Sequence, residues 1–359
     1  MGGATLPNRP RKHQSKMPRV SIGLPVYNGA NYIADAIRSV QMQTYADWEL
    51  IISDNNSTDS TVELCQQFAR DDDRIKVHVA DCNQGAAWNF NRTFELATGE
   101  LFRWLSHDDA LAPECIARCV SELDKNPDWI LCATGTAIID SEGREVLDAD
   151  THTDGPHSSG DHQELTLNSN LSFQELTPEN EARRVEAMQS SSLHERFKGV
   201  LFYSRRCYEV YGLTRRNIMA QSQLHPPYCG GEKVWLAEMA MLGKMVEIPE
   251  RLFYCRWHDE RFTANDSARE QAQHMRPETH RKSFALPHQY RSTLGYLQLA
   301  FRPGLGIRTR LQCLGTWLRF TLQIKKLSSI VVQTFQGRAT SIHLSHSTQT
   351  GKQLIGPGM

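Results

Sequence analysis

The segment Asp54-Asn55-Asn56-Ser57-Thr58-Asp59 follows a short apolar run and carries two carboxylates. A carboxylate at the carboxyl end of a strand can accept a hydrogen bond from an N–H donor of a ligand. Uracil and thymine carry such a donor at N3, whereas cytosine has an acceptor there, so Asp54 would select uridine or thymidine nucleotides. The alternative is a local role, in which Asp54 closes a turn and Asp59 caps a helix; for Asp59 capping is the favoured interpretation.

A second acidic segment, Ser106-His107-Asp108-Asp109, follows another apolar run. Two adjacent carboxylates at a strand end are costly unless a cation joins them, and Mg²⁺ or Mn²⁺ binds a few protein carboxylates together with substrate phosphates. We therefore expect Asp108 to bind a divalent metal, while Asp109 is the better candidate to cap the helix that Pro113 opens. The competing interpretation makes both carboxylates helix caps.

The elements that must position these segments alternate regularly from residue 18 to about 140. Apolar runs predict strands at 20–26, 48–53, 75–79, 101–105 and 129–139. The intervening segments have helical periodicity, and Asn31 can cap the first of them. Helices of this length can join parallel strands, so we predict an α/β fold with an open, mostly parallel sheet and helices on both faces. In such sheets the strand ends share one edge, which would gather Tyr27, Asn28, Asp54, Asn83, Gly85, Asp108 and Asp109.

Composition and motifs exclude several classes of protein. Apolar residues make up 40% and charged residues 23% of the 359 residues, which excludes a mainly disordered chain. The sequence contains no GxxxxGK[ST], and no GxGxxG follows the first strand, so neither a P-loop nor a dinucleotide site is expected. The nine cysteines are scattered without a CxxC pair, and no long uninterrupted apolar stretch is present. We therefore expect a protein of a reducing, cytoplasmic compartment without a membrane-spanning helix.

Taken together, the motifs resemble family 2 glycosyltransferases of the GT-A fold. The likeness rests on Pro25-Val26-Tyr27-Asn28, residues 54–59, Asn83-x-Gly85 with Asn91, Gly99-Glu100 and Asp108-Asp109, and it resumes at Gly231-Glu232, Gly243-Lys244, Ile248-Pro249 and Tyr254-x-Arg256-x-His258. The resemblance implies a nucleotide-diphosphate sugar as donor, with a UDP-sugar favoured, a divalent metal (Mn²⁺ or Mg²⁺) as cofactor, and a polysaccharide or glycolipid hydroxyl as acceptor. Most members of the family invert the anomeric centre. One alternative is a non-catalytic nucleotide-sugar-binding module on the same fold. A nucleotidyltransferase is a weaker alternative, because the loop after the first strand has no Lys or Arg.

The resemblance also assigns roles to individual residues. Glu232 falls at the catalytic carboxylate, and Asp108 and His258 fall at the metal. The implied nucleotide-sugar contacts are Pro25, Tyr27, Asn28, Asp54, Asn56, Asn83, Gly85, Asn91, His107, Asp108 and Arg256. The sequence departs from the family pattern at Asn55, Asn56, Ser106 and Lys233. Trp88, Trp104 and Trp235 could stack on sugars, but core packing is the favoured interpretation.

The two ends of the chain differ in charge from the body. Residues 1–20 carry five basic and residues 301–359 eight basic side chains without an acid, whereas the remaining 280 residues have a net charge of −14. The predicted organisation is a disordered basic lead (1–17), a nucleotide-sugar-binding α/β half (18–145), a polar insertion (146–196), an acceptor-side catalytic half (197–265), a helical C-terminal region (266–340) and a disordered tail (341–359). The basic, amphipathic C-terminal region is either a solvated helix face packed on the body or a peripheral contact with an anionic membrane. Nucleic acid is not an expected partner.

Overall fold

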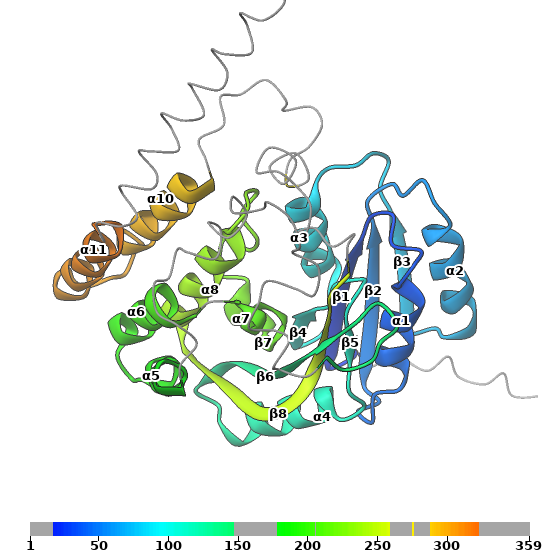
Figure 1. Cartoon of the computed structure of the whole chain (residues 1–359), viewed down its shortest axis with the longest axis horizontal. Coiled ribbons are helices and arrows are strands. Elements are labelled where there is room, and N and C mark those ends of the chain that lie inside the picture. Colours follow the sequence, from blue (N-terminus) through cyan, green and yellow to red (C-terminus); the bar gives the residue numbers. More distant parts are fainter. Residues whose placement is uncertain (1–16, 147–177, 205, 259–274, 276–287, 323–359) are drawn as a thin grey trace, which may run out of the picture.

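The structure, a computed structural model, describes residues 17–146, 178–204, 206–258, 275 and 288–322 (Figure 1). The strands are β1 (Val20–Val26), β2 (Trp48–Asp54), β3 (Ile75–Val79), β4 (Leu101–Trp104), β5 (Ala110–Leu111), β6 (Trp129–Ile139), β7 (Leu213–Arg215) and β8 (Lys244–Arg256). The helices are α1 (Ile33–Gln41), α2 (Thr61–Asp71), α3 (Ala86–Leu96), α4 (Cys115–Lys125), α5 (Pro178–Gln189), α6 (Leu193–Tyr203), α7 (Arg216–Met219), α8 (Gly231–Leu242), α10 (His288–Ala300) and α11 (Ile307–Thr321), with a 3-10 turn, η4, at Tyr208–Tyr211.

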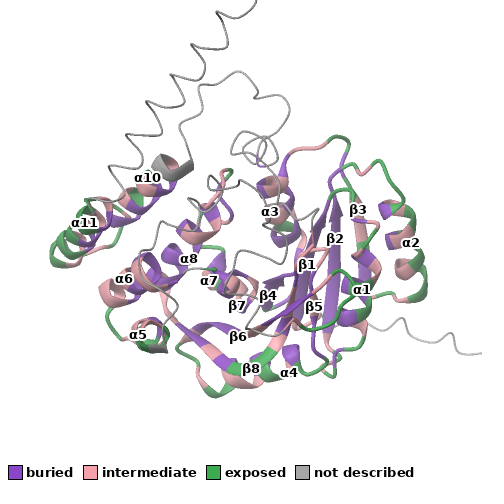
Figure 2. Ribbon diagram, in the orientation of Figure 1, coloured by how far each residue is buried: buried purple, intermediate pink, exposed green. Residues whose placement is uncertain are grey.

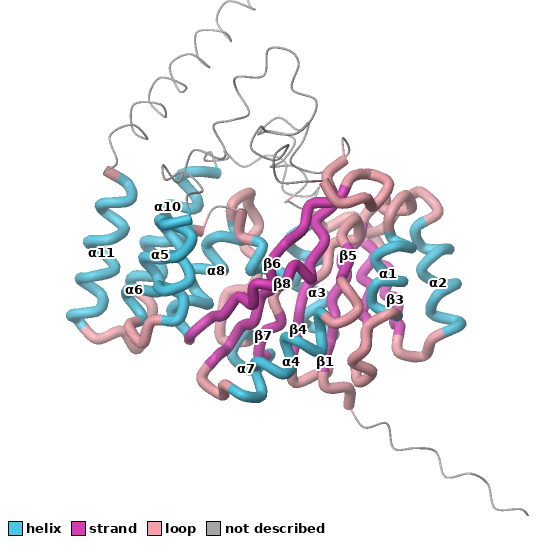
Figure 3. Tube along the Cα trace, turned by 60° about the horizontal axis from the view of Figure 1, so that its bottom comes forward, coloured by secondary structure: helices cyan, strands magenta, loops and turns pink. Residues whose placement is uncertain are grey.

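The eight strands form one sheet in the order β3-β2-β1-β4-β7-β6-β8-β5. The first four strands in this order are parallel to one another, and β6 is parallel to β8. Strand β7 runs antiparallel to both β4 and β6, and β5 is antiparallel to β8. The expected α/β sheet with a common edge for the ends of β1, β2 and β4 is therefore confirmed, within a mixed sheet (Figure 3).

Alternating side chains along the strands divide between two hydrophobic cores, because successive residues of a strand point to opposite faces. Leu50 and Ile52 lie in the core under α1, α2 and α4, whereas Ile51 between them lies in the core under α3, α6 and α8. Figure 2 shows the sheet as the most deeply buried layer, between helices on both sides. Trp104 and Trp235 are buried in the second core, so the core interpretation of these two tryptophans is the right one.

The last two described helices belong to the body of the molecule. Helix α10 packs on α8, and α11 packs on α6 and α10. Arg302, between the two helices, donates from Nη1 to Oε1 of the buried Glu238 on α8 at 2.7 Å. None of the described helices is both long and apolar enough to cross a membrane.

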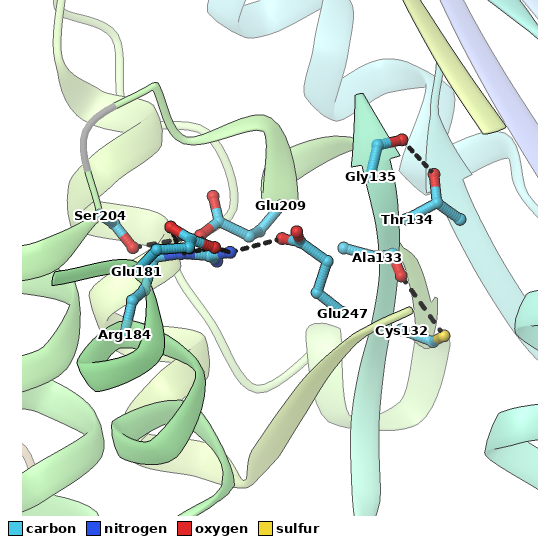
Figure 4. Close-up of polar contacts among 9 residues, drawn as sticks. All are labelled: Cys132, Ala133, Thr134, Gly135, Glu181, Arg184, Ser204, Glu209 and Glu247. Carbon is cyan, nitrogen blue, oxygen red and sulfur yellow. Dashed lines mark hydrogen bonds and ion pairs between the residues drawn. The ribbon is translucent and has the colours of Figure 1, made fainter. Parts of the chain in front are cut away.

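A buried ion cluster attaches α5 to the sheet (Figure 4). The guanidinium of Arg184 donates to Glu209 on η4 at 2.5 Å and to Glu247 on β8 at 2.8 Å, and it also bonds Glu181 on its own helix. Three carboxylates share one cation here. Burial, together with the charge of Glu209, therefore raises the pKa of Glu247 to about 7 even though Arg184 opposes this shift.

Several local predictions differ from the structure. Helix α1 has Tyr32, not Asn31, at its cap position, and α4 has Glu114 rather than Asp109. The sequence also predicts a strand at Leu252–Arg256, whereas β8 begins at Lys244. The segment predicted to be a disordered tail (341–359), almost all of the predicted lead (1–17) and most of the predicted polar insertion (146–196) lie outside the described residues.

Candidate active site

The ends of β1 and β2 are joined into one platform. Val26 and Asp54 are paired in the sheet, and the amide of Asn55 donates to the carbonyl of Val26 at 2.9 Å. Beyond the strands, Oδ1 of Asn28 accepts from the amide of Thr58 at 2.8 Å, while the amide of Asn28 donates to Oγ of Ser57 at 2.8 Å. Both Asn28 and Asn56 have positive φ, at 52° and 65°, so the two loops fold back toward each other.

One carboxylate oxygen of Asp54 accepts a hydrogen bond, and the other has no partner among the described residues. The residue is fully buried, and Oδ2 accepts from the amide of Ser57 at 2.9 Å. Oδ1 is also buried, yet within the described part of the chain it has no hydrogen-bond partner. A buried, unpaired carboxylate oxygen costs free energy, and native proteins rarely leave one unmatched. The position is therefore prepared for a donor that comes from outside the chain.

Asn83 and Gly85 shape the adjoining loop before α3. Oδ1 of Asn83 accepts from the amide of Gly85 and from Nδ2 of Asn55, both at 2.9 Å. Gly85 has a φ of 87°, which side-chain-bearing residues rarely adopt. In return, the amide of Gln84 donates to Oδ1 of Asn55, so the departure from the family pattern at residue 55 supplies both a donor and an acceptor to this loop.

Asn89, which sequence reasoning missed, fastens α3 to the same strand ends. Its Nδ2 donates to the carbonyls of Val26 and Ser53 at 3.1 and 2.8 Å, and its Oδ1 accepts from Oγ of Ser53. The available signal was an asparagine inside a helical segment between Trp88 and Phe90, because asparagine is a poor helix former unless its amide has a specific partner.

The segment after β4 lies against the loop after β1. A Cβ on Gly29 would come within 2.4 Å of Cδ2 of His107, so only glycine permits this approach. Oδ2 of Asp108 is 3.2 Å from Nε2 of His258, and the ring of His258 packs on Tyr32. Burial disfavours the charged form of Asp108, but the His258 hydrogen bond and the charge of His107 outweigh it and lower the pKa of this carboxyl.

The two adjacent carboxylates have different surroundings. Oδ1 of Asp109 accepts from the backbone amide of Arg256 at 3.0 Å, and the side chain is buried. Burial and repulsion by Asp108 raise the pKa of Asp109 well above its ordinary value. Asp109 therefore anchors β8 to this segment, and of the two adjacent carboxylates only Asp108 is partly exposed.

The guanidinium of Arg256, which is predicted to contact the nucleotide sugar, bonds to protein groups in the structure. Its Nε donates to the carbonyl of Asp108 at 2.8 Å, and Nη1 donates to the carbonyls of Asp140 and Ser141 at 3.2 and 3.1 Å. Nη2 contacts Asp35 at 3.4 Å, and the buried guanidinium lies over the ring of Tyr32. All three guanidinium nitrogens thus have protein partners, and Nε is the one that holds the Asp108 segment.

Ser106, which replaces a carboxylate of the family pattern, is bonded to the protein core. Its Oγ donates to the hydroxyl of Tyr211 at 2.9 Å, and Tyr211 stacks on Phe253. A carboxylate at position 106 would face a phenol whose pKa burial and the charge of Asp109 raise well above its ordinary value. The serine therefore joins the end of β4 to η4.

Asn91, which is predicted to contact the nucleotide sugar, bonds to the backbone of His225. Its Nδ2 donates to the carbonyl of His225 at 3.0 Å, and its Oδ1 accepts from the amide of the same residue at 2.8 Å. This two-point contact holds the loop that leads into α8. Phe90 and Trp104 pack on the ring of His225, and Trp235 packs on Trp104, so α3, β4 and α8 meet at this loop.

Glu232 lies in the first turn of α8, directly after this loop. Its charge acts on the neighbouring rings: burial and then Glu232 raise the pKa of Tyr228 to about 12, and Glu232 opposes the lowering that burial imposes on the pKa of His225. The carboxylate is half-buried. Helix α3 connects this region to the Asp54 platform, as Figure 1 shows, because it begins directly after Gly85 and holds the α8 loop through Asn91.

Asp108 and His258 fit a divalent cation that is shared with a ligand. They contribute a carboxylate and an imidazole within 3.2 Å of each other, and Nδ1 of His258 is buried without a partner among the described residues. No group of three or more His, Cys, Asp or Glu side chains in the described residues could enclose a metal alone. A cation at this edge would complete its coordination with ligand oxygens and water, as Mg²⁺ does in phosphate sites.

The chain is similar to known glycosyltransferases. Residues 21–189 match the model of glycosyl transferase family 2. A GalNAc(5)-diNAcBac-PP-undecaprenol beta-1,3-glucosyltransferase of Campylobacter jejuni is 32% identical over 128 residues, which cover 35% of this chain and 40% of that protein. An uncharacterized glycosyltransferase of Nostoc is 33% identical over 150 residues, 42% of this chain and 45% of that protein. The chain thus spans less than half the length of these relatives.

Two solved structures share the fold of this chain. The S. aureus TarS 1–349 complex with UDP covers 85% of this chain and 72% of its own, with a TM-score of 0.54 and 14% identity. The mannosyltransferase PcManGT of Pyrobaculum calidifontis, in complex with GDP-Man and Mn²⁺, covers 93% and 82% with a TM-score of 0.50 and 15% identity. At these identities the likeness concerns the fold, and it confirms the predicted GT-A architecture.

Proposed function

We propose that this protein transfers a sugar from a nucleotide-diphosphate sugar, with UDP as the favoured nucleotide, to a hydroxyl of a saccharide or lipid-linked acceptor. The observation that supports this most strongly is the buried Oδ1 of Asp54, which has no partner among the described residues and lies at the shared edge of β1 and β2. The uracil N3–H is a donor of the required kind. The match of residues 21–189 to the family model and the UDP complex of TarS support the same donor class.

In the proposed reaction the chain's own groups position the donor and move one proton. The acceptor oxygen forms a bond to the anomeric carbon as the bond from that carbon to the diphosphate oxygen breaks, which inverts the anomeric centre. Glu232 takes the proton of the acceptor hydroxyl, a task that contributes about 10²- to 10⁴-fold to rate in enzymes. Asp108 and His258 would hold a divalent ion, Mn²⁺ or Mg²⁺, whose chemistry is to neutralise charge on the diphosphate. Asp109 and Arg256 keep Asp108 in place.

The decisive experiment measures UDP release from a panel of UDP-sugars with Mn²⁺ present. Glu232→Gln should lower turnover about 10²-fold or more while UDP affinity stays the same, because only the proton acceptor is lost. Glu63→Gln is the matched control, since Glu63 is an exposed carboxylate in the first turn of another helix, α2. UDP binding without any nucleotide release from the wild-type protein would instead assign the chain to the non-catalytic binding class.

A further inference from the structure

Helix α11 has two apolar faces. One face packs inward, where Cys313 and Phe320 are buried in the core shared with α6, α8 and α10. The other face carries four large aliphatic side chains that are between 48% and 71% exposed: Ile307, Leu311, Leu318 and Leu322. Globular proteins leave single apolar residues exposed, but a row of them on one helix marks an interaction surface.

The spacing of the four exposed residues places them in one stripe. Steps of four, seven and four residues return to the same side of a helix that has 3.6 residues per turn. By the same geometry the stripe lies roughly opposite Cys313 and Phe320, so it faces away from the body. Figure 2 shows α11 at one end of the molecule with exposed residues on its outer side. No described residue covers the stripe.

Arginines border this stripe on both sides. Arg308 and Arg319 are exposed and lie on one side of it, and Arg310 lies on the other. Phe301, 54% exposed, extends the apolar surface beyond the start of the helix, with the guanidinium of Arg310 over its ring. Residues 301–359 contain no Asp or Glu, so nothing in this part of the sequence offsets the positive charge.

We propose that α11 is a membrane-docking helix that lies in the plane of an anionic lipid surface, with the stripe Ile307, Leu311, Leu318 and Leu322 in the acyl boundary and the flanking arginines at the phosphates. A helix with an apolar stripe between basic side chains is the arrangement that binds such surfaces. A second copy of the chain fits less well, because a symmetric contact would bring the same arginines of both copies together without an acid between them. The bilayer surface supplies both the apolar layer and the negative charge.

Flotation of the full-length protein with phosphatidylcholine–phosphatidylglycerol vesicles tests the proposal, with pure phosphatidylcholine vesicles as the comparison. Leu311→Gln/Leu318→Gln should reduce binding to the anionic vesicles about tenfold or more, because two exposed leucines no longer enter the lipid. Glutamine is also a good helix former, so α11 should remain folded. The matched control is Met42→Gln/Val79→Thr, which removes two exposed apolar side chains elsewhere and should leave binding unchanged.

Arg308→Gln/Arg319→Gln tests the electrostatic part and should weaken anionic-vesicle binding about fivefold for each arginine removed, with little effect on neutral vesicles. Failure of the wild-type chain to float, or equal flotation of the leucine variant, would overturn the proposal. So would light scattering that shows a wild-type dimer and a monomeric leucine variant, since this result would assign the stripe to a second copy. UDP release measured without vesicles should be the same in all these variants. A failure of membrane binding can therefore be distinguished from a failure of the proposed transfer activity.

Discussion

Replacing Asp54 by asparagine should change which nucleotide the site prefers. In the native structure Oδ2 accepts from the amide of Ser57 at 2.9 Å, while Oδ1 is buried without a partner in the described part of the chain. An asparagine can keep the Ser57 bond through its single amide oxygen, and this places an NH₂ group where Oδ1 stood. The position then donates a hydrogen bond where it previously accepted one.

The expected decrease in UDP affinity follows from the loss of one hydrogen bond to a charged group. Such bonds contribute about 1.5–3 kcal/mol, which corresponds to about a 10- to 150-fold weaker affinity for UDP. Cytosine has an acceptor at N3, so CDP should lose much less and can gain. Isothermal titration of UDP and CDP against both proteins measures the ratio of the two dissociation constants, and this ratio should move toward CDP by about tenfold or more in Asp54→Asn.

Two further measurements make this prediction specific. The free energy of unfolding without nucleotide should stay level or rise in Asp54→Asn, because the substitution removes a buried charge that has one unpaired oxygen. Asp59→Asn is the matched control in the same loop. Its carboxylate accepts from the amides of Thr61 and Ala30, so this variant should lose stability and keep the native nucleotide preference. Equal weakening of UDP and CDP by Asp54→Asn would refute base reading by this residue.

Two other predictions concern groups that position the site and the sheet. Because the folded-state pKa of Glu247 (about 7) lies above its ordinary 4.5, the folded state binds more protons and stability falls as pH rises through this window. Glu247→Gln should therefore make the free energy of unfolding less dependent on pH and raise it by about 1–2 kcal/mol near pH 8. This value is discounted for solvent screening, because 26% of the side chain is exposed. Urea unfolding near pH 5 and near pH 8 measures the change. Asn91→Ala should cost about 1–3 kcal/mol, because the backbone of His225 loses both partners, and it should lower turnover without changing the affinity for UDP. A lower UDP affinity at native stability would instead restore Asn91 as a direct donor contact.

The part of the fold that sequence reasoning predicted is the part with strong periodicity. Strands β1, β2, β3, β4 and β6 lie within one residue of their predicted ends, because each is a buried apolar run that turn residues interrupt. Strands β5 and β7 have two and three residues, and they exist only because distant strands pair with them. Sequence reasoning did not predict the first half of β8, because this part of the strand contains Pro249, which lies at a shift in the register against β6.

Sequence reasoning also predicted only a part of the candidate site. The sequence placed the polar residues at the strand ends, since this needs only the order of elements and the edge rule for parallel sheets. It did not predict the partners of Asn91 and Arg256, which are determined by contacts across 134 and 148 residues of chain. An amide or a guanidinium near a ligand site can bind the ligand or the backbone, and the residue type is compatible with both.

Helix α3 explains how the two halves of the site are coupled. The helix begins after Gly85, and the loop of Gly85 is hydrogen-bonded to Asn55 beside Asp54. Asn89, in the first half of the helix, is hydrogen-bonded to the ends of β1 and β2. Asn91 holds the loop before Glu232. Because one helix and the loop that precedes it make all of these hydrogen bonds, a displacement at the ends of β1 and β2, where the donor is proposed to bind, would also move the loop before α8. This is the reason to expect Asn91→Ala to affect turnover and not UDP affinity: the substitution releases only the acceptor-side contact of α3, while the contacts of Asn89 and the Gly85 loop with the donor edge remain.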